Sequence, residues 1–252
     1  MKLYNFRDLG GMLTKCNQEV RPGLLYRTGN VAHWSDRAAQ YVAEECGVKL
    51  YIDFRRPDEV ETFGRPEALL RKKIEWLPVS INTSDPEFES KKLPKKQDWL
   101  DLYKRLFEKN IEAWRRFTHT VASANVPILY GCLFGKDRTG IGTSLLLNIL
   151  EVHDTHIVSD YAQTTHEIRP LSEMIEPLLS RQQPATQHSP AATEEEIFEH
   201  FSRSHETVMS KFLEYLRTHP SEHPVGEDLQ AMTDLFRTPL KSRLLKPPSN
   251  KS

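Results

Sequence analysis

One short stretch, residues 129–140, constrains this chain more than any other: it reads Leu-Tyr-Gly-Cys-Leu-Phe-Gly-Lys-Asp-Arg-Thr-Gly. The apolar run 126–130 is typical of a buried strand, and the largely apolar run 139–150 is typical of a helix. Between them, a tight loop containing glycine separates Cys132 from Arg138. Strand, loop and helix in this order direct backbone N–H groups and the positive end of the helix dipole at one point. The sequence therefore predicts an anion-binding loop in an α/β fold.

The residue types in this loop predict chemistry on a phosphoryl group. A thiolate at Cys132 would be stabilised by the loop N–H groups and by the guanidinium of Arg138. A guanidinium matches two phosphate oxygens in a bidentate arrangement. The alternative is a buried structural cysteine and an unrelated surface arginine, but it does not account for Gly135 or the Thr-Gly pair that follows. We therefore predict that Cys132 attacks phosphorus while Arg138 binds the phosphate oxygens.

The pattern Cys-x-x-Gly-Lys-Asp-Arg-Thr-Gly resembles the phosphate loop of bacterial and fungal tyrosine phosphatases of dual-specificity-like type. Residues 5–11, 23–29 and 50–59 resemble further segments of that family in order and spacing. The resemblance implies a cysteine-phosphatase-like α/β fold, with a central, largely parallel sheet flanked by helices. It also implies that the C-terminal helices form either a layer on the core or a lid over the site.

The resemblance implies roles for individual residues. Cys132 would be the nucleophile, Arg138 the phosphate clamp and Asp137 the general acid. The phosphate-binding residues would be Leu133, Phe134, Gly135, Lys136, Arg138 and Thr139. Asp85 is an alternative general acid, although Asp-Pro is also an ordinary turn signal. An ion pair between Lys136 and Asp137 that only braces the turn is a second alternative. Neither a metal nor a cofactor is expected.

Other polar residues are expected to support the loop. The resemblance implies hydrogen bonds to the loop carbonyls from an N-terminal set: Asn5, Arg7, Asp8 and Arg27. Thr139 would donate to the cysteine sulfur or cap the following helix. Arg55 would contact the substrate or pair with Glu59 at helical spacing, and the ion pair is the more conservative prediction.

The chain departs from the resembled loop immediately before the cysteine, where the family has histidine and this sequence has Gly131. Glycine removes a hydrogen-bond donor and adds backbone freedom. We expect a looser loop, and hence a phosphatase reaction that is slower or a site that is repurposed.

Two functional hypotheses follow. The first is a cysteine-dependent phosphatase that hydrolyses a phosphomonoester through a cysteinyl-phosphate intermediate. Its substrate would be a phosphotyrosine or phosphoserine/threonine protein, a phosphoinositide or a small phosphorylated metabolite. The second is a phosphatase-like protein that retains the anion pocket but whose turnover is lost or repurposed, as a pseudophosphatase or an enzyme of a metabolite pathway. Sulfur transfer of the rhodanese type is a distant third.

Composition sets the remaining expectations. The 252 residues include 34 basic and 35 acidic side chains, so no strong charge predicts a nucleic-acid partner. Three scattered cysteines suggest neither a disulfide framework nor a zinc site, and indicate a reducing, cytoplasmic location. No long apolar run predicts membrane insertion.

The domain organisation follows from changes in composition along the chain. We expect a catalytic core over 1–180, an exposed loop over 181–193, C-terminal helices packed on the core over 194–240, and a disordered tail over 241–252.

Overall fold

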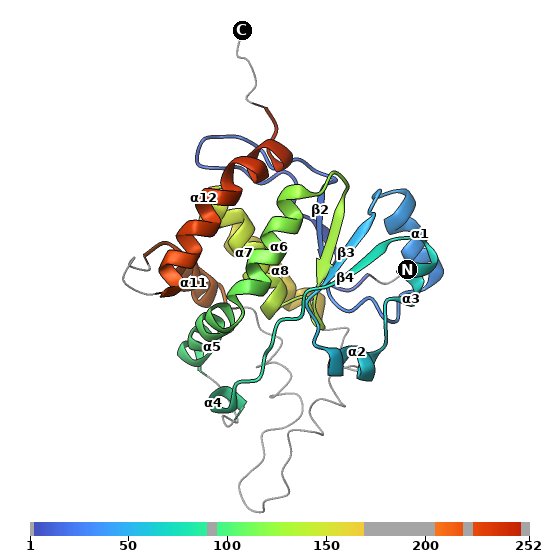
Figure 1. Ribbon diagram of the computed structural model, residues 1–252, viewed down its shortest axis with the longest axis horizontal. Coiled ribbons are helices and arrows are strands. Elements are labelled where there is room, and N and C mark those ends of the chain that lie inside the picture. The colour runs from blue at the N-terminus through green and yellow to red at the C-terminus, as the bar shows by residue number, and fades with distance from the viewer. Residues whose placement is uncertain (1–2, 90–94, 169–204, 219–223, 248–252) are drawn as a thin grey trace, which may run out of the picture.

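The computed structural model describes residues 3–89, 95–168, 205–218 and 224–247. Within these residues, five strands form one sheet in the order β1-β2-β5-β3-β4 (Figure 1). The four parallel strands are β2 (Leu25–Thr28), β5 (Ile128–Gly131), β3 (Leu50–Asp53) and β4 (Glu75–Pro78). The short edge strand β1 (Arg7–Asp8) is antiparallel to β2. The predicted, largely parallel α/β sheet is confirmed.

The central strand β5 shows why the sheet is covered on both faces. All four of its residues are buried, as expected for a parallel strand between two layers of helix. Leu129 packs in one apolar cluster, whereas its neighbours Ile128 and Tyr130 pack in another, because successive side chains of a strand point to opposite faces. The sequence of β5 is therefore apolar without a break, because both faces of the strand are covered.

The smaller cluster lies under helices α1 (Asp36–Glu44) and α3 (Glu67–Arg71), on the side of the sheet shown at the right of Figure 1. Ser35 caps α1 by accepting a hydrogen bond from the N–H of Ala38, as the sequence predicts. Helix α2 (Pro57–Phe63) follows β3 and begins with proline, which suits the first turn of a helix. This short helix carries Glu59 to the site described below.

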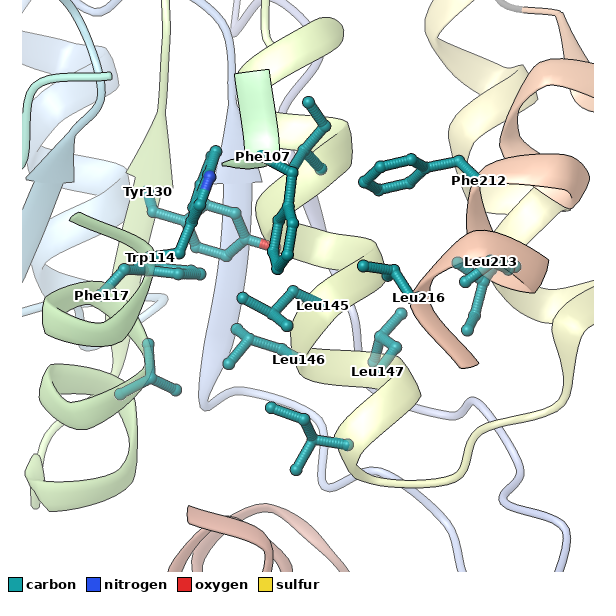
Figure 2. Close-up of a cluster of buried hydrophobic side chains, with 14 of the residues drawn as sticks. Phe107, Trp114, Phe117, Tyr130, Leu145, Leu146, Leu147, Phe212, Leu213 and Leu216 are labelled. Atoms are coloured by element: carbon teal, nitrogen blue, oxygen red, sulfur yellow. The ribbon is translucent and has the colours of Figure 1, made fainter. Parts of the chain in front are cut away.

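The larger cluster lies under the helices on the other side of the sheet. They are α5 (Lys96–Lys109), α6 (Ile111–Ser123), α7 (Asp137–Ile149), α8 (Asp154–Ile168), α11 (Glu206–Thr218) and α12 (Pro224–Leu244). Figure 2 shows Phe117 of α6 beside Tyr130 of β5, and their ring centroids lie 5.1 Å apart. Helix α7 is buried nearly all round, which fits its strongly apolar sequence.

The apolar periodicity of residues 99–124 predicts one continuous helix, but this prediction is wrong: the structure has two helices, separated at Asn110. The side-chain amide of Asn110 donates to the carbonyls of Leu106 (2.8 Å) and Asn82 (3.0 Å) and accepts from the N–H of Asn82 (2.8 Å). Asparagine side chains that bond to the backbone compete with continuation of a helix. The polar sequence 82–98 predicts a loop before this region, and the structure has a short helix within it, α4 (Pro86–Glu89).

The described C-terminal helices form a packed layer. Phe212 and Leu213 of α11 are fully buried, and Figure 2 shows Leu216 of the same helix beside Leu147 of α7. The tail predicted from residue 241 is wrong in its first part, because α12 continues to Leu244 and Leu245 pairs with Val20. The loop predicted over 181–193 and the start of the C-terminal helices lie outside the described residues. In the part of the chain that the structure describes, no helix is both long and apolar enough to cross a bilayer.

Candidate active site

The predicted phosphate loop joins the carboxyl end of β5 to the start of α7. Binding sites in parallel α/β sheets lie at this edge of the sheet. Cys132 follows the strand directly and is 2% exposed. Its sulfur accepts a hydrogen bond from the hydroxyl of Thr139, with 3.1 Å between Oγ1 and Sγ. Of the two roles considered for Thr139, the structure therefore shows donation to the cysteine.

Two side chains from the N-terminal segment hold the loop by its carbonyls. The amide of Asn5 donates to the carbonyl oxygens of Phe134 and Gly135, both at 3.0 Å. Arg27 donates from Nη2 to the carbonyl of Gly135 at 2.6 Å. The supporting role predicted for these two residues is confirmed. All these bonds are buried or partly buried, so they fix the loop relative to β2.

These bonds determine where the loop N–H groups point. The carbonyl of Leu133 also accepts from the scaffold, from the N–H of Asn30 at 2.9 Å. The C=O of one residue and the N–H of the next point in opposite directions across a trans peptide, so the tied carbonyls of Leu133 and Phe134 turn the N–H groups of Phe134 and Gly135 away from the scaffold. Among the described residues, the N–H groups of 133–135 have no acceptor. They are therefore available to an anion.

The loop reaches this position only because Gly135 has a positive φ of 68°. A Cβ atom there would lie 2.6 Å from the carbonyl oxygen of Thr28 and 2.8 Å from the amide nitrogen of Asn5. Glycine is the residue that satisfies both the conformation and the close approach.

Asp160 of α8 completes the support. Strand pairing places Arg7 directly opposite Arg27, and like charges so placed repel. Asp160, 2% exposed, accepts from Nε of Arg7 at 2.5 Å and from Nη1 of Arg27. Burial alone would raise the pKa of Asp160, but the two arginines lower it. Sequence reasoning missed Asp160, because nothing local to α8 indicates which distant cations it meets.

Arg7 and Asp8 differ from their predicted roles. Arg7 supports the loop indirectly, by donating to Asp160, to Asn5 and to the hydroxyl of Thr164, which in turn donates to Asn5. Asp8 accepts from the N–H groups of Gly10 (2.9 Å) and Gly23 (2.6 Å), so it fixes the N-terminal turns. The prediction that both bond to the loop carbonyls is therefore wrong.

Arg138 is held by a carboxylate from another helix. Its Nη1 and Nη2 donate to the two carboxylate oxygens of Glu59 at 2.5 and 2.7 Å, and Nη1 also donates to the carbonyl of Phe54 at 3.2 Å. Burial alone would lower the pKa of Arg138, but Glu59 raises it. A guanidinium has five N–H donors. The remaining Nε and Nη2 donors form one edge, which is suited to two oxygens of a phosphate.

The ion pair predicted between Arg55 and Glu59 is wrong. Arg55 pairs instead with Asp53, with 2.8 Å between Nη2 and Oδ2, and its side chain is fully buried. The helical spacing argument fails because Arg55 precedes α2, which begins only at Pro57. Arg55 therefore braces the end of β3.

Lys136 and Asp137 occupy the end of the loop. Lys136 is 1% exposed; its Nζ lies 4.0 Å from the ring centroid of Trp99 and 3.6 Å from Oδ1 of Asp137. Burial lowers the pKa of Lys136, against the effect of Asp137. The same Oδ1 accepts from the hydroxyl of Tyr103 at 2.6 Å. Sequence reasoning missed Trp99 and Tyr103 as neighbours of the site, since it identified only an apolar face of their helix.

Asp85, the alternative general acid, is 2% exposed and pairs with two cations of α5. Its Oδ2 lies 2.7 Å from Nε of Arg105 and 3.5 Å from Nζ of Lys109. Asp137, in contrast, is part of the phosphate loop itself, and its side chain is 27% exposed.

Gly131 is a paired residue of β5. It stands opposite Thr28 of β2 and Asp53 of β3, and its carbonyl accepts from the N–H of Phe54 at 2.8 Å. A Cβ at this position would lie 2.5 Å from the carbonyl oxygen of Thr28. The missing side chain of Gly131 therefore lets β2 and β5 approach closely, and the looser loop expected from the sequence stays a prediction.

Several known proteins resemble this chain in sequence. Residues 1–223 match the model of a family described as the tyrosine phosphatase family. A Cupriavidus necator protein with the provisional name tyrosine-protein phosphatase is 31% identical over 168 residues, which are 64% of this chain and 60% of that protein. A tyrosine-protein phosphatase of Nostoc commune is 29% identical over 143 residues, covering 56% of this chain and 48% of that protein. The chain thus spans about half to three fifths of the length of these relatives.

Two solved structures align less closely. The crystal structure of P. aeruginosa TpbA has 15% identity and a TM-score of 0.33, covering 85% of this chain and 89% of that one. The core catalytic domain of the S. cerevisiae PP-IP phosphatase SIW14, in complex with citrate, has 15% identity and a TM-score of 0.36, covering 73% and 97%.

Proposed function

Because the chain belongs to the tyrosine phosphatase family, we propose that it hydrolyses a phosphomonoester through a cysteinyl-phosphate intermediate at Cys132. The observation that carries this proposal is the orientation of Arg138. Glu59 and Phe54 occupy one side of its guanidinium, and the remaining edge is left for two phosphate oxygens. Cys132 belongs to the same loop as the N–H groups of 133–135, which have no acceptor among the residues that the structure describes.

In the first step, the Cys132 thiolate attacks phosphorus as the bond to the leaving oxygen breaks. The loop N–H groups and Arg138 stabilise the charge on the equatorial oxygens of the transition state. Asp137 gives a proton to the leaving oxygen, a role that its place in the loop and its partly exposed side chain support.

In the second step, water attacks the cysteinyl phosphate and the sulfur leaves as a thiolate. The hydroxyl of Thr139 stabilises this thiolate, because it already donates to the sulfur at 3.1 Å. Asp137, now ionised, accepts a proton from the attacking water. The enzyme then returns to its starting state.

The substrate is a phosphomonoester, and we propose phosphotyrosine as the first candidate. The two relatives, which each align with more than half of this chain, are named tyrosine-protein phosphatases. Phosphoserine or phosphothreonine proteins, phosphoinositides and small phosphorylated metabolites remain the other members of the class. A thiolate nucleophile requires a reducing compartment, so we propose the cytoplasm as its location.

The test is turnover of p-nitrophenyl phosphate by the purified protein under reducing conditions. Cys132→Ser should abolish turnover, because the serine hydroxyl is a much weaker nucleophile. Cys16→Ser is the matched control: this cysteine is exposed, and the variant should retain native activity. If the native protein is inert and does not bind vanadate, or if Cys132→Ser keeps its turnover, the proposed function is wrong.

A further inference from the structure

Two buried tyrosines form a hydrogen-bonded chain that ends on Asp137. The hydroxyl of Tyr103, on α5, donates to Oδ1 of Asp137 at 2.6 Å. The hydroxyl oxygens of Tyr103 and Tyr161, on α8, lie 2.5 Å apart. A phenol has one hydrogen, so Tyr103 cannot donate to both neighbours. While Tyr103 donates to the carboxylate, its oxygen accepts from Tyr161.

The surrounding rings fix the position of Tyr103. Its side chain is fully buried, and its ring meets those of Trp99, Tyr161 and Phe212 edge-on, with centroid distances of 6.5, 6.2 and 5.9 Å. Burial, followed by the charge of Asp137, raises the pKa of Tyr103 well above its ordinary value. The hydroxyl therefore remains a donor at any pH used for a phosphatase assay.

This contact makes the two oxygens of Asp137 different. Oδ1 accepts from Tyr103 and lies 3.6 Å from Nζ of Lys136. Oδ2 has no partner within the described part of the chain, and the side chain is 27% exposed. When Asp137 is a neutral acid that still accepts from Tyr103 through Oδ1, its proton is on Oδ2. Only that oxygen is then able to give a proton to a substrate.

We infer that Tyr103, itself oriented by Tyr161, is a positioning residue that presents Oδ2 of Asp137 to the leaving oxygen. This inference rests on the proposed function, because it assigns Tyr103 a part in the proton transfer of that reaction. As the bond from phosphorus to oxygen breaks, its electron pair stays on the oxygen and the proton moves there from Oδ2. Asp137 becomes a carboxylate, to which Tyr103 continues to donate.

The experiment compares two aryl phosphates that differ in their need for protonation. The leaving group of p-nitrophenyl phosphate is stable as an anion, whereas that of phenyl phosphate depends on a general acid. Tyr103→Phe should lower kcat/KM for phenyl phosphate by about tenfold and change kcat/KM for p-nitrophenyl phosphate by less than about twofold, because kcat/KM reports only the steps up to formation of the cysteinyl phosphate. Asp137→Asn should show the same selectivity with a loss of about a hundredfold.

A matched control is Tyr215→Phe. The hydroxyl of Tyr215 donates to Oε1 of Glu108 at 2.5 Å, so this variant also removes a bond from tyrosine to carboxylate, but away from Asp137. It should leave the ratio of the two rates unchanged. Tyr161→Phe keeps the hydroxyl of Tyr103 and removes its donor, so a smaller selective loss is expected. This variant decides the question if Tyr103→Phe does not fold.

The outcomes separate the two proposals. If Tyr103→Phe lowers kcat/KM equally for both substrates, or for neither, the role of Tyr103 is overturned while the proposed phosphatase activity stands. A native protein without Cys132-dependent turnover would overturn both proposals, and the p-nitrophenyl phosphate assay of the native protein and Cys132→Ser reveals this before any tyrosine is changed.

Discussion

Replacing Glu59 by glutamine tests how Arg138 is held. The two side chains are 9% and 7% exposed and share two hydrogen bonds of 2.5 and 2.7 Å. Glutamine keeps the shape but turns an NH₂ group toward the N–H donors of Arg138. Removing one partner of a buried ion pair costs about 3–5 kcal/mol, and we take about 3 because a glutamine oxygen still accepts one bond. For a chain of this size, about 3 kcal/mol lowers Tm by roughly 6–12 °C.

The kinetic effect of Glu59→Gln should separate binding from chemistry. The variant removes a negative charge beside the anion site, so vanadate should bind as tightly as to the native protein or more tightly. Orientation of Arg138 in the transition state is lost, and a hydrogen bond to a charged group contributes about 1.5–3 kcal/mol. We therefore expect kcat to fall by roughly 10- to 100-fold.

The assay measures kcat on an aryl phosphate, Ki for vanadate and Tm for the native protein, Glu59→Gln and Glu61→Gln. Glu61 is the control, because it lies on the same helix and is exposed. An unchanged kcat together with an unchanged Tm would refute the reasoning that Glu59 orients Arg138. Weaker vanadate binding with an unchanged kcat would show that Glu59 acts on the bound anion instead.

Three further predictions concern the loop and its support. Gly131→Ala places a Cβ 2.5 Å from the carbonyl oxygen of Thr28. We therefore expect the free energy of unfolding, measured in urea, to fall by about 1–3 kcal/mol and turnover to be reduced. Native values for both quantities would contradict the need for a close approach at this position. Asp160→Asn should alter the pH dependence of stability. The pKa of Asp160 is lowered in the folded protein, so its ionised form stabilises the fold above the ordinary value of 3.8, and this contribution is lost as pH falls through the lower folded-state pKa. Unfolding midpoints measured from neutral to acidic pH should therefore fall less steeply for the variant than for the native protein, and parallel curves would exclude this role. Thr139→Ala removes the hydroxyl that donates to the sulfur of Cys132. It should slow breakdown of the cysteinyl phosphate by about tenfold, which would appear as a burst of released phenol before the steady state. An unchanged steady-state rate without a burst would show that the hydroxyl is not needed.

The local features of the site were predictable from the sequence. Strand, loop and helix occur in one continuous segment, so the apolar runs on either side of Cys132 were sufficient to place the loop. The supporting bonds from Asn5 and Arg27 were predicted because their segments resemble those of a known family. The split at Asn110 was missed, since periodicity continues across it and the interruption comes from side-chain bonds to the backbone.

The sequence by itself determined the anion-binding loop, because the nucleophile, the arginine and the start of the helix are set by consecutive residues and by backbone geometry. Only the tertiary structure decided their partners: Glu59 for Arg138, Tyr103 for Asp137, and Asp160 for Arg7 and Arg27. Spacing along a chain specifies contacts within one helix or strand. These pairs join different elements, and their geometry depends on how the helices pack against the sheet.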